Sequence, residues 1–543
     1  MRTVVSCGRR VVAADDVTVS RPSNHRRRRR GSGTRAVRRR VLAPDPGRLR
    51  LRQASRAVLG VGVAAAAPAA VGLPLECTVV GGLTALLALF TVTDRTVRGQ
   101  AATVALLPAA GIPVLSLALA LRDVPLARDA AFLAVTFAGA YARRWGPRGH
   151  ALGIFAFMMF FAAQFLTTGF EGAWRLNAAL VLSLAAASAV RFGLWCIERR
   201  TPPPAAPAPP EGRGLQRPTT RLAVQVTVAC ALALTAGQAV STQRWYWAVG
   251  AAWWIFVNTA SRGETLVRGF RRVLGTLLGI VAGMWIAVPV DGAPLPTVAL
   301  LACCVFGIFY TAAVSYSWMM FFVTVLVGLM YGALGILRPG LLELRLLETA
   351  IGALAAAVAV ALVLPVTTHA ATNAWIRRTV HCVHACARDA ARRLSGDLAA
   401  DPRTRIVELE LLLGRARSSL APLVHPLNPL VARRARAREV LALLDDCALR
   451  ARALADVADD PAASHDARLT EACRRVEEAV GRLVEPHAPS GDPTAPAPRT
   501  PRGPARAACH DRALGHLHEL EAALVDLAEP VHAPTRAPLT TAA

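Results

Sequence analysis

Residues 345–366 of this sequence read RLLETAIGALAAAVAVALVLPV. After its first five residues the stretch contains no charged side chain, and alanine, valine and leucine dominate it. A helix needs about 20 apolar residues to cross the hydrocarbon core of a bilayer. The stretch therefore predicts a transmembrane helix.

Similar apolar runs recur from residue 57 onward, and one proline-rich segment interrupts the series. Residues 201–210 read TPPPAAPAPP, which cannot form a helix and predicts a stiff, solvated linker. We expect six spans on each side of it, at residues 57–73, 77–93, 101–121, 129–142, 150–167 and 175–196, then 221–240, 245–260, 273–290, 295–313, 316–333 and 345–366. The predicted fold class is an all-α polytopic membrane protein with about 12 transmembrane helices, in agreement with a hydrophobic content of 54%.

The net charge of +26 lies mainly outside these runs. No lysine is present, so the 62 basic residues are all arginine, and lysine-dependent catalysis is excluded. The first 56 residues alone hold 17 arginines and 3 acids. Of the arginines in the predicted short loops, 14 lie on one side of the membrane and 6 on the other. Because arginine-rich loops face the cytoplasm, we expect a multi-pass plasma-membrane protein with both termini cytoplasmic.

Composition divides the chain into seven segments. We expect a basic disordered cytoplasmic leader at 1–56, a six-helix membrane repeat at 57–198, a proline-rich cytoplasmic linker at 199–220, a second six-helix membrane repeat at 221–369, a cytoplasmic helical domain at 370–485, a proline-rich linker at 486–504, and a C-terminal helix and tail at 505–543.

Short matches in the same order indicate the repeats. MMFF at 158–161 matches MMFF at 319–322, and WRL at 174–176 matches LRL at 344–346. Six is an even number, so the two repeats are expected to run parallel. Transporters built from such repeats hold their substrate between them.

Polar and aromatic residues inside the predicted spans are candidates for a substrate path, because polar groups are costly there. Glu348 is the best placed carboxylate for proton coupling, although an ion pair with Arg345, three residues earlier, is the simpler interpretation. Trp253 and Trp254 lie deep enough to stack on an aromatic acid. For the polar candidates, a hydrogen bond to a neighbouring helix or a reach toward the membrane surface is the alternative. The expected path comprises Glu348, Arg191, Gln225, Gln238, Asn258, Trp253 and Trp254.

Two further patterns lie just before and within the span at 273–290. An inner vestibule that gathers an anionic substrate is predicted at Arg268, Arg271 and Arg272, with lipid phosphate contact as the alternative. Close helix packing is predicted from the small-x-x-x-small spacing of Gly275, Gly279 and Gly283.

The aromatic run Trp245-Tyr246-Trp247 lies at a predicted outer boundary. Tryptophan and tyrosine are enriched where a membrane meets water. The run is therefore predicted to anchor a helix at that interface.

Catalytic and metal signatures are absent from the sequence. It has no His-Glu-x-x-His, Gly-x-Ser-x-Gly, dinucleotide or Walker pattern. His381, Cys382, His384 and Cys386 spread over two faces of a helix, whereas structural zinc needs four convergent ligands. We predict no catalytic residue, no metal site and no cofactor, and no nucleic-acid partner for the nearly neutral C-terminal region.

Four stretches carry a family resemblance: WAVGAAWW at 247–254, RGFRRVLGTLLG at 268–279, RLLETAIG at 345–352 and RRWGPRG at 143–149. They resemble the fusaric acid resistance protein-like family of integral membrane proteins, over roughly residues 57–369. The resemblance implies a two-repeat transmembrane unit with a cytoplasmic helical domain and export of aromatic acids. The plant aluminium-activated malate transporters look like distant relatives that act as anion channels.

The predicted function is export of small organic anions across the membrane, with aromatic carboxylic acids as candidate substrates, and not enzymatic catalysis. The expected partners are the lipid bilayer and the anion, and a homo-oligomer is left open. A passive anion channel and a membrane scaffold with a helical interaction domain are the alternatives.

Overall fold

The computed structural model describes most of the chain after residue 47. The described residues are 48–94, 96–198, 214, 217–259, 261–290, 293–333, 339–364, 368–394, 397, 399–424, 431–458, 467–484 and 504–532. They contain helices and no strand. Most of the predicted leader and both proline-rich segments, at 201–210 and 486–503, lie outside the described residues.

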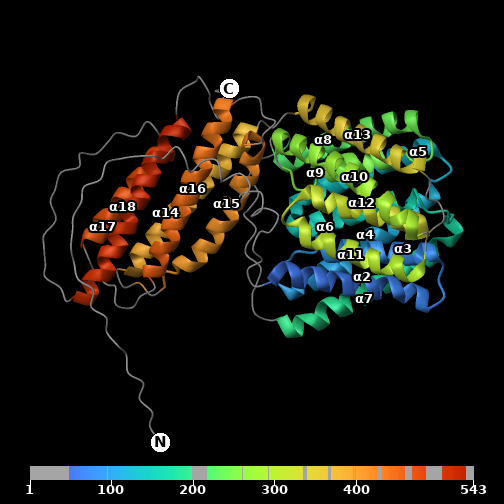
Figure 1. Cartoon of the computed structure of the whole chain (residues 1–543), viewed down its shortest axis with the longest axis horizontal. Coiled ribbons are helices and arrows are strands. Elements are labelled where there is room, and N and C mark those ends of the chain that lie inside the picture. The colour runs from blue at the N-terminus through green and yellow to red at the C-terminus, as the bar shows by residue number, and fades with distance from the viewer. Residues whose placement is uncertain are drawn as a thin grey trace, which may run out of the picture. The chain divides into compact units, whose positions relative to one another are not determined.

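Twelve α-helices form the first part of the described chain (Figure 1). They are α2 (Leu49–Ala70), α3 (Leu75–Thr91), α4 (Val97–Ala120), α5 (Pro125–Tyr141), α6 (Gly146–Ala163), α7 (Ala173–Glu198), α8 (Pro218–Val240), α9 (Tyr246–Phe256), α10 (Arg262–Val290), α11 (Pro294–Ala312), α12 (Tyr316–Ala333) and α13 (Pro339–Leu362). Each predicted span overlaps one of them.

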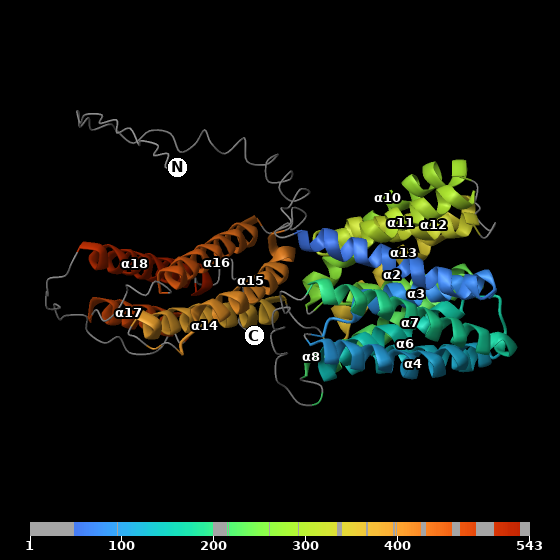
Figure 2. The same cartoon turned by 90° about the horizontal axis from the view of Figure 1, so that it is seen from below.

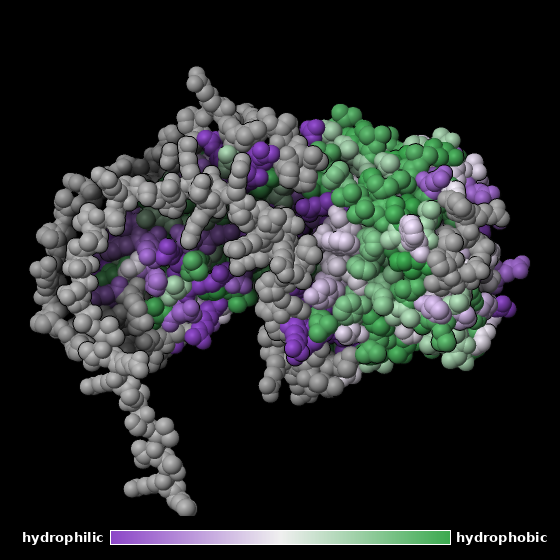
Figure 3. Space-filling model, viewed as in Figure 1, coloured by the Kyte–Doolittle hydropathy of each residue, from purple (hydrophilic) through white to green (hydrophobic). Residues whose placement is uncertain are grey.

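Seven of the described helices are long and apolar enough to cross a membrane, namely α4, α7, α8, α10, α11, α12 and α13. The helix α3 is apolar but shorter. Apolar residues cover much of the visible face of the part that contains α2–α13 (Figure 3). These findings establish an all-helical, multi-pass membrane protein, whereas the count of 12 spans stays a prediction.

Several helix bounds differ from the predicted spans, and two of the differences concern α2 and α9. The helix α2 begins at Leu49, so residues 49–56 are helical rather than part of a disordered leader. The helix α9 has only 11 residues, where the sequence predicts a span over 245–260. It ends at Phe256, the next residue Val257 is extended, and Asn258 then adopts a left-handed φ of 64°. Asparagine tolerates this conformation better than most residues.

An aromatic section of the core of this part lies where α5, α6 and α9 meet. The Phe132 ring stacks on Phe160 with centroids 4.8 Å apart, and the Phe157 ring stacks on Trp253 at 4.2 Å. Offset aromatic stacking of this kind adds about 0.5–1.5 kcal/mol to the burial of each pair. Trp245, Tyr246 and Trp247 are all buried. They therefore pack inside the protein, and the prediction that they anchor a helix at the membrane surface is wrong.

Five further helices form a second bundle: α14 (Thr368–Leu394), α15 (Pro402–Val424), α16 (Val431–Ala458), α17 (Ala467–Val484) and α18 (Pro504–His532). Figures 1 and 2 show these helices lying side by side. Leucine, alanine, valine and cysteine side chains fill their common core. Ion pairs such as Arg417–Asp445 lie on their exposed faces.

Candidate functional site

Two arginines one turn apart on α10 converge on one tyrosine of α12. The Cζ atom of Arg268 lies 4.0 Å from the centroid of the Tyr316 ring. The Nη1 atom of Arg272 donates to the Tyr316 hydroxyl oxygen at 3.1 Å. The Nε atoms of both arginines are buried without a hydrogen-bond partner among the described residues. We call Arg268, Arg272 and Tyr316 the Tyr316 cluster.

A second group of arginines and aromatic rings forms where α9, α12 and α13 meet. The Cζ atom of Arg345 lies 5.0 Å from the centroid of the Trp247 ring, and that of Arg244 lies 6.0 Å from it. Arg244 donates to the Tyr246 hydroxyl oxygen at 2.9 Å, and the Tyr331 ring lies 5.7 Å from Trp247. We call these five residues the Trp247 cluster.

Electrostatics link the two clusters. The positive charges of Arg272 and Arg345 act on each other. No ion pair among the described residues joins Arg244, Arg268, Arg272 or Arg345 to a carboxylate. Removing a positively charged side chain from water costs several kcal/mol unless a counter-charge offsets this penalty. The two clusters are therefore electrostatically suited to an anion.

Glu348 lies one turn after Arg345 on α13. The carboxyl group is fully buried, and neither oxygen has a hydrogen-bond partner of normal geometry among the described residues. The ion pair with Arg345 that the spacing favours is therefore not formed. An unpartnered polar group at membrane depth is costly, so its presence asks for an explanation beyond packing.

The neutral candidates of the predicted path make internal hydrogen bonds or stacking contacts. Gln225 donates to the carbonyl oxygens of Val363 and Leu364 at 2.8 and 3.0 Å. Gln238 donates to the Asp129 carboxylate at 2.7 Å. One face of Trp253 is occupied by Phe157.

Trp253 also lines a small cavity, with Arg143 and His150 among its other lining residues. The cavity measures about 10 Å³, which is room for roughly one water molecule. Neither Glu348 nor Gln225 lines it. The predicted path residues therefore do not share this cavity.

Four other candidates of the predicted path and vestibule remain, namely Arg191, Asn258, Arg271 and Trp254. Arg191 donates to the carbonyl oxygens of Ala88 and Val92 at the end of α3. Asn258 follows α9 and bonds the His150 side chain. Arg271 and Trp254 are half-buried. The carbonyl oxygen of Trp254 accepts the Tyr316 hydroxyl at 3.4 Å, which ties it to the Tyr316 cluster.

The α10 glycines lie beside α12. A Cβ atom on Gly275 would lie 2.4 Å from the Ser317 carbonyl oxygen, and one on Gly279 would lie 2.7 Å from the Thr324 Cβ. A Cβ atom on Gly283 would meet its first neighbour, the Val325 Cα, only at 3.9 Å. The close approach of the two backbones positions Tyr316 against the α10 arginines.

Several members of the clusters escaped the sequence prediction. From the sequence, Arg345 is predicted only as an ion-pair partner of Glu348, and Arg244, Tyr316 and Tyr331 have no predicted place in a substrate site. The signal that could have found them is chemical, because tyrosine and tryptophan are common partners of buried arginine. Their convergence from different helices is not visible in linear spacing.

Comparison with known proteins agrees with the membrane fold. Residues 229–380, which run from α8 into α14 and include all of α9–α13, match the family model described as fusaric acid resistance protein-like. No curated protein matches the chain. The match covers little more than a quarter of the 543 residues and contains every arginine of both clusters. Residues 229–380 are thus similar to the fusaric acid resistance protein-like family, which confirms the resemblance seen in the sequence over this segment.

Proposed function

We propose that this protein is a membrane transporter that exports small organic anions, with aromatic carboxylic acids as candidate substrates. The observation that carries the proposal is the set of four arginines in the Tyr316 and Trp247 clusters, which lack a carboxylate partner among the described residues. A guanidinium group presents a planar fork of donors that suits a carboxylate. The family description of residues 229–380 names resistance to an organic acid, which supports the same substrate class.

The aromatic rings in the clusters favour an aromatic acid over an aliphatic one. Trp247, Tyr246 and Tyr316 contact the arginines, and Tyr331 packs against Trp247. A carboxylate on a guanidinium group would place an attached ring next to these side chains. Stacking between rings contributes about 0.5–1.5 kcal/mol per pair.

A two-repeat architecture would place these clusters within the second repeat. The pairing of α4 with α6 corresponds to that of α10 with α12, and the pairing of α3 with α7 corresponds to that of α9 with α13. The pairings α5 with α6 and α11 with α12 also correspond. This recurrence supports parallel repeats, in which two sets of helices change their relative position during transport.

Export of benzoate by cells tests the proposal. Cells that overexpress the protein are loaded with labelled benzoate, and efflux is compared with that of deletion cells. We expect R272Q and R345Q to reduce efflux about tenfold, which corresponds to the loss of one charged contact of about 1.4 kcal/mol. R175Q is the matched control, because Arg175 also lies over a tryptophan ring, that of Trp174, but at an exposed position. Equal efflux in deletion and overexpressing cells for benzoate and other aromatic acids would disprove the function.

A passive anion channel is the second candidate. The same observation favours it, because arginines without counter-charge also line pores that conduct anions. Voltage-clamp recording of the reconstituted protein separates the two functions. A channel shows unitary currents carried by the anion, whereas a transporter shows none.

A further inference from the structure

Glu348 is enclosed where α8, α9 and α13 cross. A Cβ atom placed on Gly237 of α8 would lie 3.0 Å from the Glu348 Oε2 atom and 3.0 Å from the Trp245 carbonyl oxygen. A Cβ atom on Gly352, one turn further along α13, would lie 2.3 Å from the Ala248 carbonyl oxygen. The glycines let the three helices approach so closely that the carboxyl group has no exposed surface.

The groups around the carboxyl are almost all uncharged. From α8 it meets Gly237, and from α9 it faces the Ala248 backbone amide. That amide already donates to the Trp245 carbonyl oxygen at 3.1 Å. On α13 the ionisable side chain within one turn is Arg345.

The other charged and titratable side chains of this region lie around Arg345 and not around Glu348. They are Arg272 from α10, Tyr331 from α12 and Tyr246 from α9, with Arg244 bonded to Tyr246. Neither Glu348 oxygen has a hydrogen-bond partner among the described residues, and no ion pair between these residues joins Glu348 to Arg345. In this structure the carboxyl group and the guanidinium group therefore lie one turn apart without pairing.

An ionised carboxylate without hydrogen bonds or a counter-charge is very costly at this depth, so the arrangement suits the neutral, protonated acid. After loss of the proton, the natural counter-charge is Arg345, which lies at the i–3 position on the same helix face. An anionic substrate needs the same guanidinium group. Ionised Glu348 and the substrate therefore compete for Arg345.

We propose that Glu348 is a proton-binding site that is linked to anion binding, so that a proton on Glu348 strengthens the binding of a carboxylate at Arg345. The proposal rests on the proposed function, because it requires an anion site at the Trp247 cluster. Linkage is reciprocal, so a bound anion also strengthens proton binding by the same factor. A proton and a monovalent carboxylate that are bound together carry no net charge.

Equilibrium binding of benzoate to the full-length protein in lipid nanodiscs tests this linkage. Affinity is measured from about pH 5.5 to about pH 8.5, a range in which benzoate stays ionised and a buried glutamate can titrate. For the wild type we expect the affinity to fall about tenfold or more as the pH rises, which is a typical coupling between sites. In E348Q the affinity should stay high at every pH, because glutamine mimics the protonated acid. E348D retains a carboxyl group, so its affinity should still fall with rising pH.

The variants distinguish the possible failures. Benzoate that binds the wild type with the same affinity at every pH, or an E348Q profile that matches the wild type, would overturn the linkage and leave the proposed function standing. Absence of benzoate binding to the wild type at every pH would overturn both. Benzamide, the neutral analogue, serves as a second probe, and its binding should show no dependence on pH or on Glu348.

Discussion

At the scale of single residues, two buried ionisable side chains of this protein differ in what their partners provide. Arg191 donates to the Ala88 and Val92 carbonyl oxygens at 3.2 and 2.6 Å and to the Gln100 side chain at 3.2 Å. These carbonyls belong to the C-terminal end of α3, where a positive charge is favourable. Glu348 has no such partners. Arg191 is thus explained by the fold, whereas Glu348 is not.

We expect R191Q to destabilise the protein without changing the affinity for anions. The shorter, neutral side chain loses charged hydrogen bonds to two buried carbonyl groups, which should cost about 2–3 kcal/mol. The effect is measured by thermal unfolding, with the loss of monodisperse protein as the readout. R122Q is the matched control, because Arg122 also donates to two carbonyl oxygens, those of Thr167 and Thr168, but in a more exposed setting. A tenfold change in benzoate affinity for R191Q would contradict this structural role.

The candidate site was only partly predictable from the sequence. Glu348 stood out because charges inside apolar runs are rare, and Arg268 and Arg272 stood out because they cluster just before the apolar run at 273–290. Tyr316 and Tyr331 did not, because a tyrosine in an apolar helix is ordinary. Arg244 and Arg345 lie at helix boundaries, where arginine is expected for topological reasons. Which of these residues face each other depends on helix rotation, and a single sequence does not specify it.

At the scale of elements, helix existence was predictable and helix length was less so. Residues 245–257 are almost all apolar, so composition alone predicts a helix that extends beyond Phe256, where α9 ends. The backbone instead turns at Asn258, which has a positive φ. The end of α9 is thus set by the backbone conformation at Asn258 and not by the hydrophobic pattern.

The α10–α12 contact gives a prediction at this scale. In G275A the added methyl group would lie 2.4 Å from the Ser317 carbonyl oxygen, which is backbone and cannot move aside as a side chain would. We expect a loss of about 1–3 kcal/mol in stability and lower benzoate affinity, since the helices that carry Arg272 and Tyr316 must separate. Thermal stability in detergent and benzoate binding measure the two effects.

G283A, in the same helix, is the control for that substitution. Its methyl group meets its first neighbour only at 3.9 Å, so we expect no clash. Alanine favours a helix over glycine by about 1 kcal/mol. Stability should stay equal or rise slightly. A G283A variant as unstable as G275A would show that the close contact is not the cause.

The start of α15 provides a pH-dependent prediction outside the membrane helices. Asp401 accepts a hydrogen bond from the Thr404 hydroxyl at 2.5 Å and from the backbone amides of Arg403 and Thr404. The Thr404 hydroxyl contributes most to holding the pKa of Asp401 below its usual range. The stabilisation by this cap is therefore present above the unfolded pKa of aspartate. It disappears as the pH falls through the lower folded pKa.

We expect D401A to remove the cap at neutral pH at a cost of about 1 kcal/mol. Amide hydrogen exchange in the first turn of α15 should then be about fivefold faster than in the wild type. At a pH below the folded pKa the two proteins should exchange alike. Faster exchange of D401A that persists unchanged in acid would refute the role of the ionised carboxylate.

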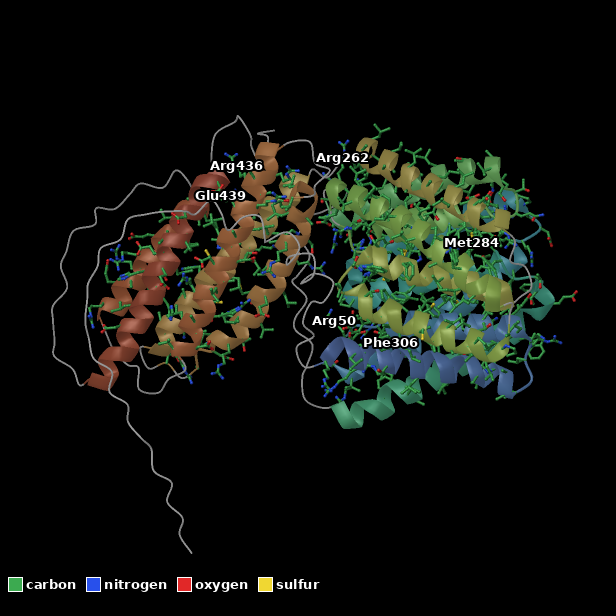
Figure 4. All side chains as sticks on the ribbon, viewed as in Figure 1. Arg50, Arg262, Met284, Phe306, Arg436 and Glu439 are labelled. Atoms are coloured by element: carbon green, nitrogen blue, oxygen red, sulfur yellow. The ribbon has the colours of Figure 1, made fainter. Side chains whose placement is uncertain are left out.

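At the scale of the whole molecule, the arginine distribution and the helices together predict which helix ends face the cytoplasm. The described chain supplies seven helices that are long and apolar enough to cross a membrane, one shorter apolar helix and four others in the same part. Arg262 and Met284 lie toward opposite ends of α10 (Figure 4). The arginine count of the predicted loops favours the Arg262 end as the cytoplasmic one.

Epitope tags inserted in single loops test this orientation. A tag between α12 and α13 should be accessible from outside intact cells, whereas a tag between α11 and α12 should be accessible only after permeabilisation. A tag at the C-terminus should also be protected in intact cells. Exposure of the α11–α12 tag on intact cells would invert the proposed topology.

The short helix α9 has a consequence for the electrical properties of the membrane protein. Eleven residues rise about 16 Å, roughly half the thickness of the hydrocarbon core of about 30 Å. A voltage that falls across the length of α9 alone produces about twice the field that it would produce across the full core. Arg345 and Glu348 lie beside the first turns of α9. Movement of unpaired charge along this stretch would therefore be sensitive to voltage, whereas movement of a proton together with a monovalent carboxylate would not.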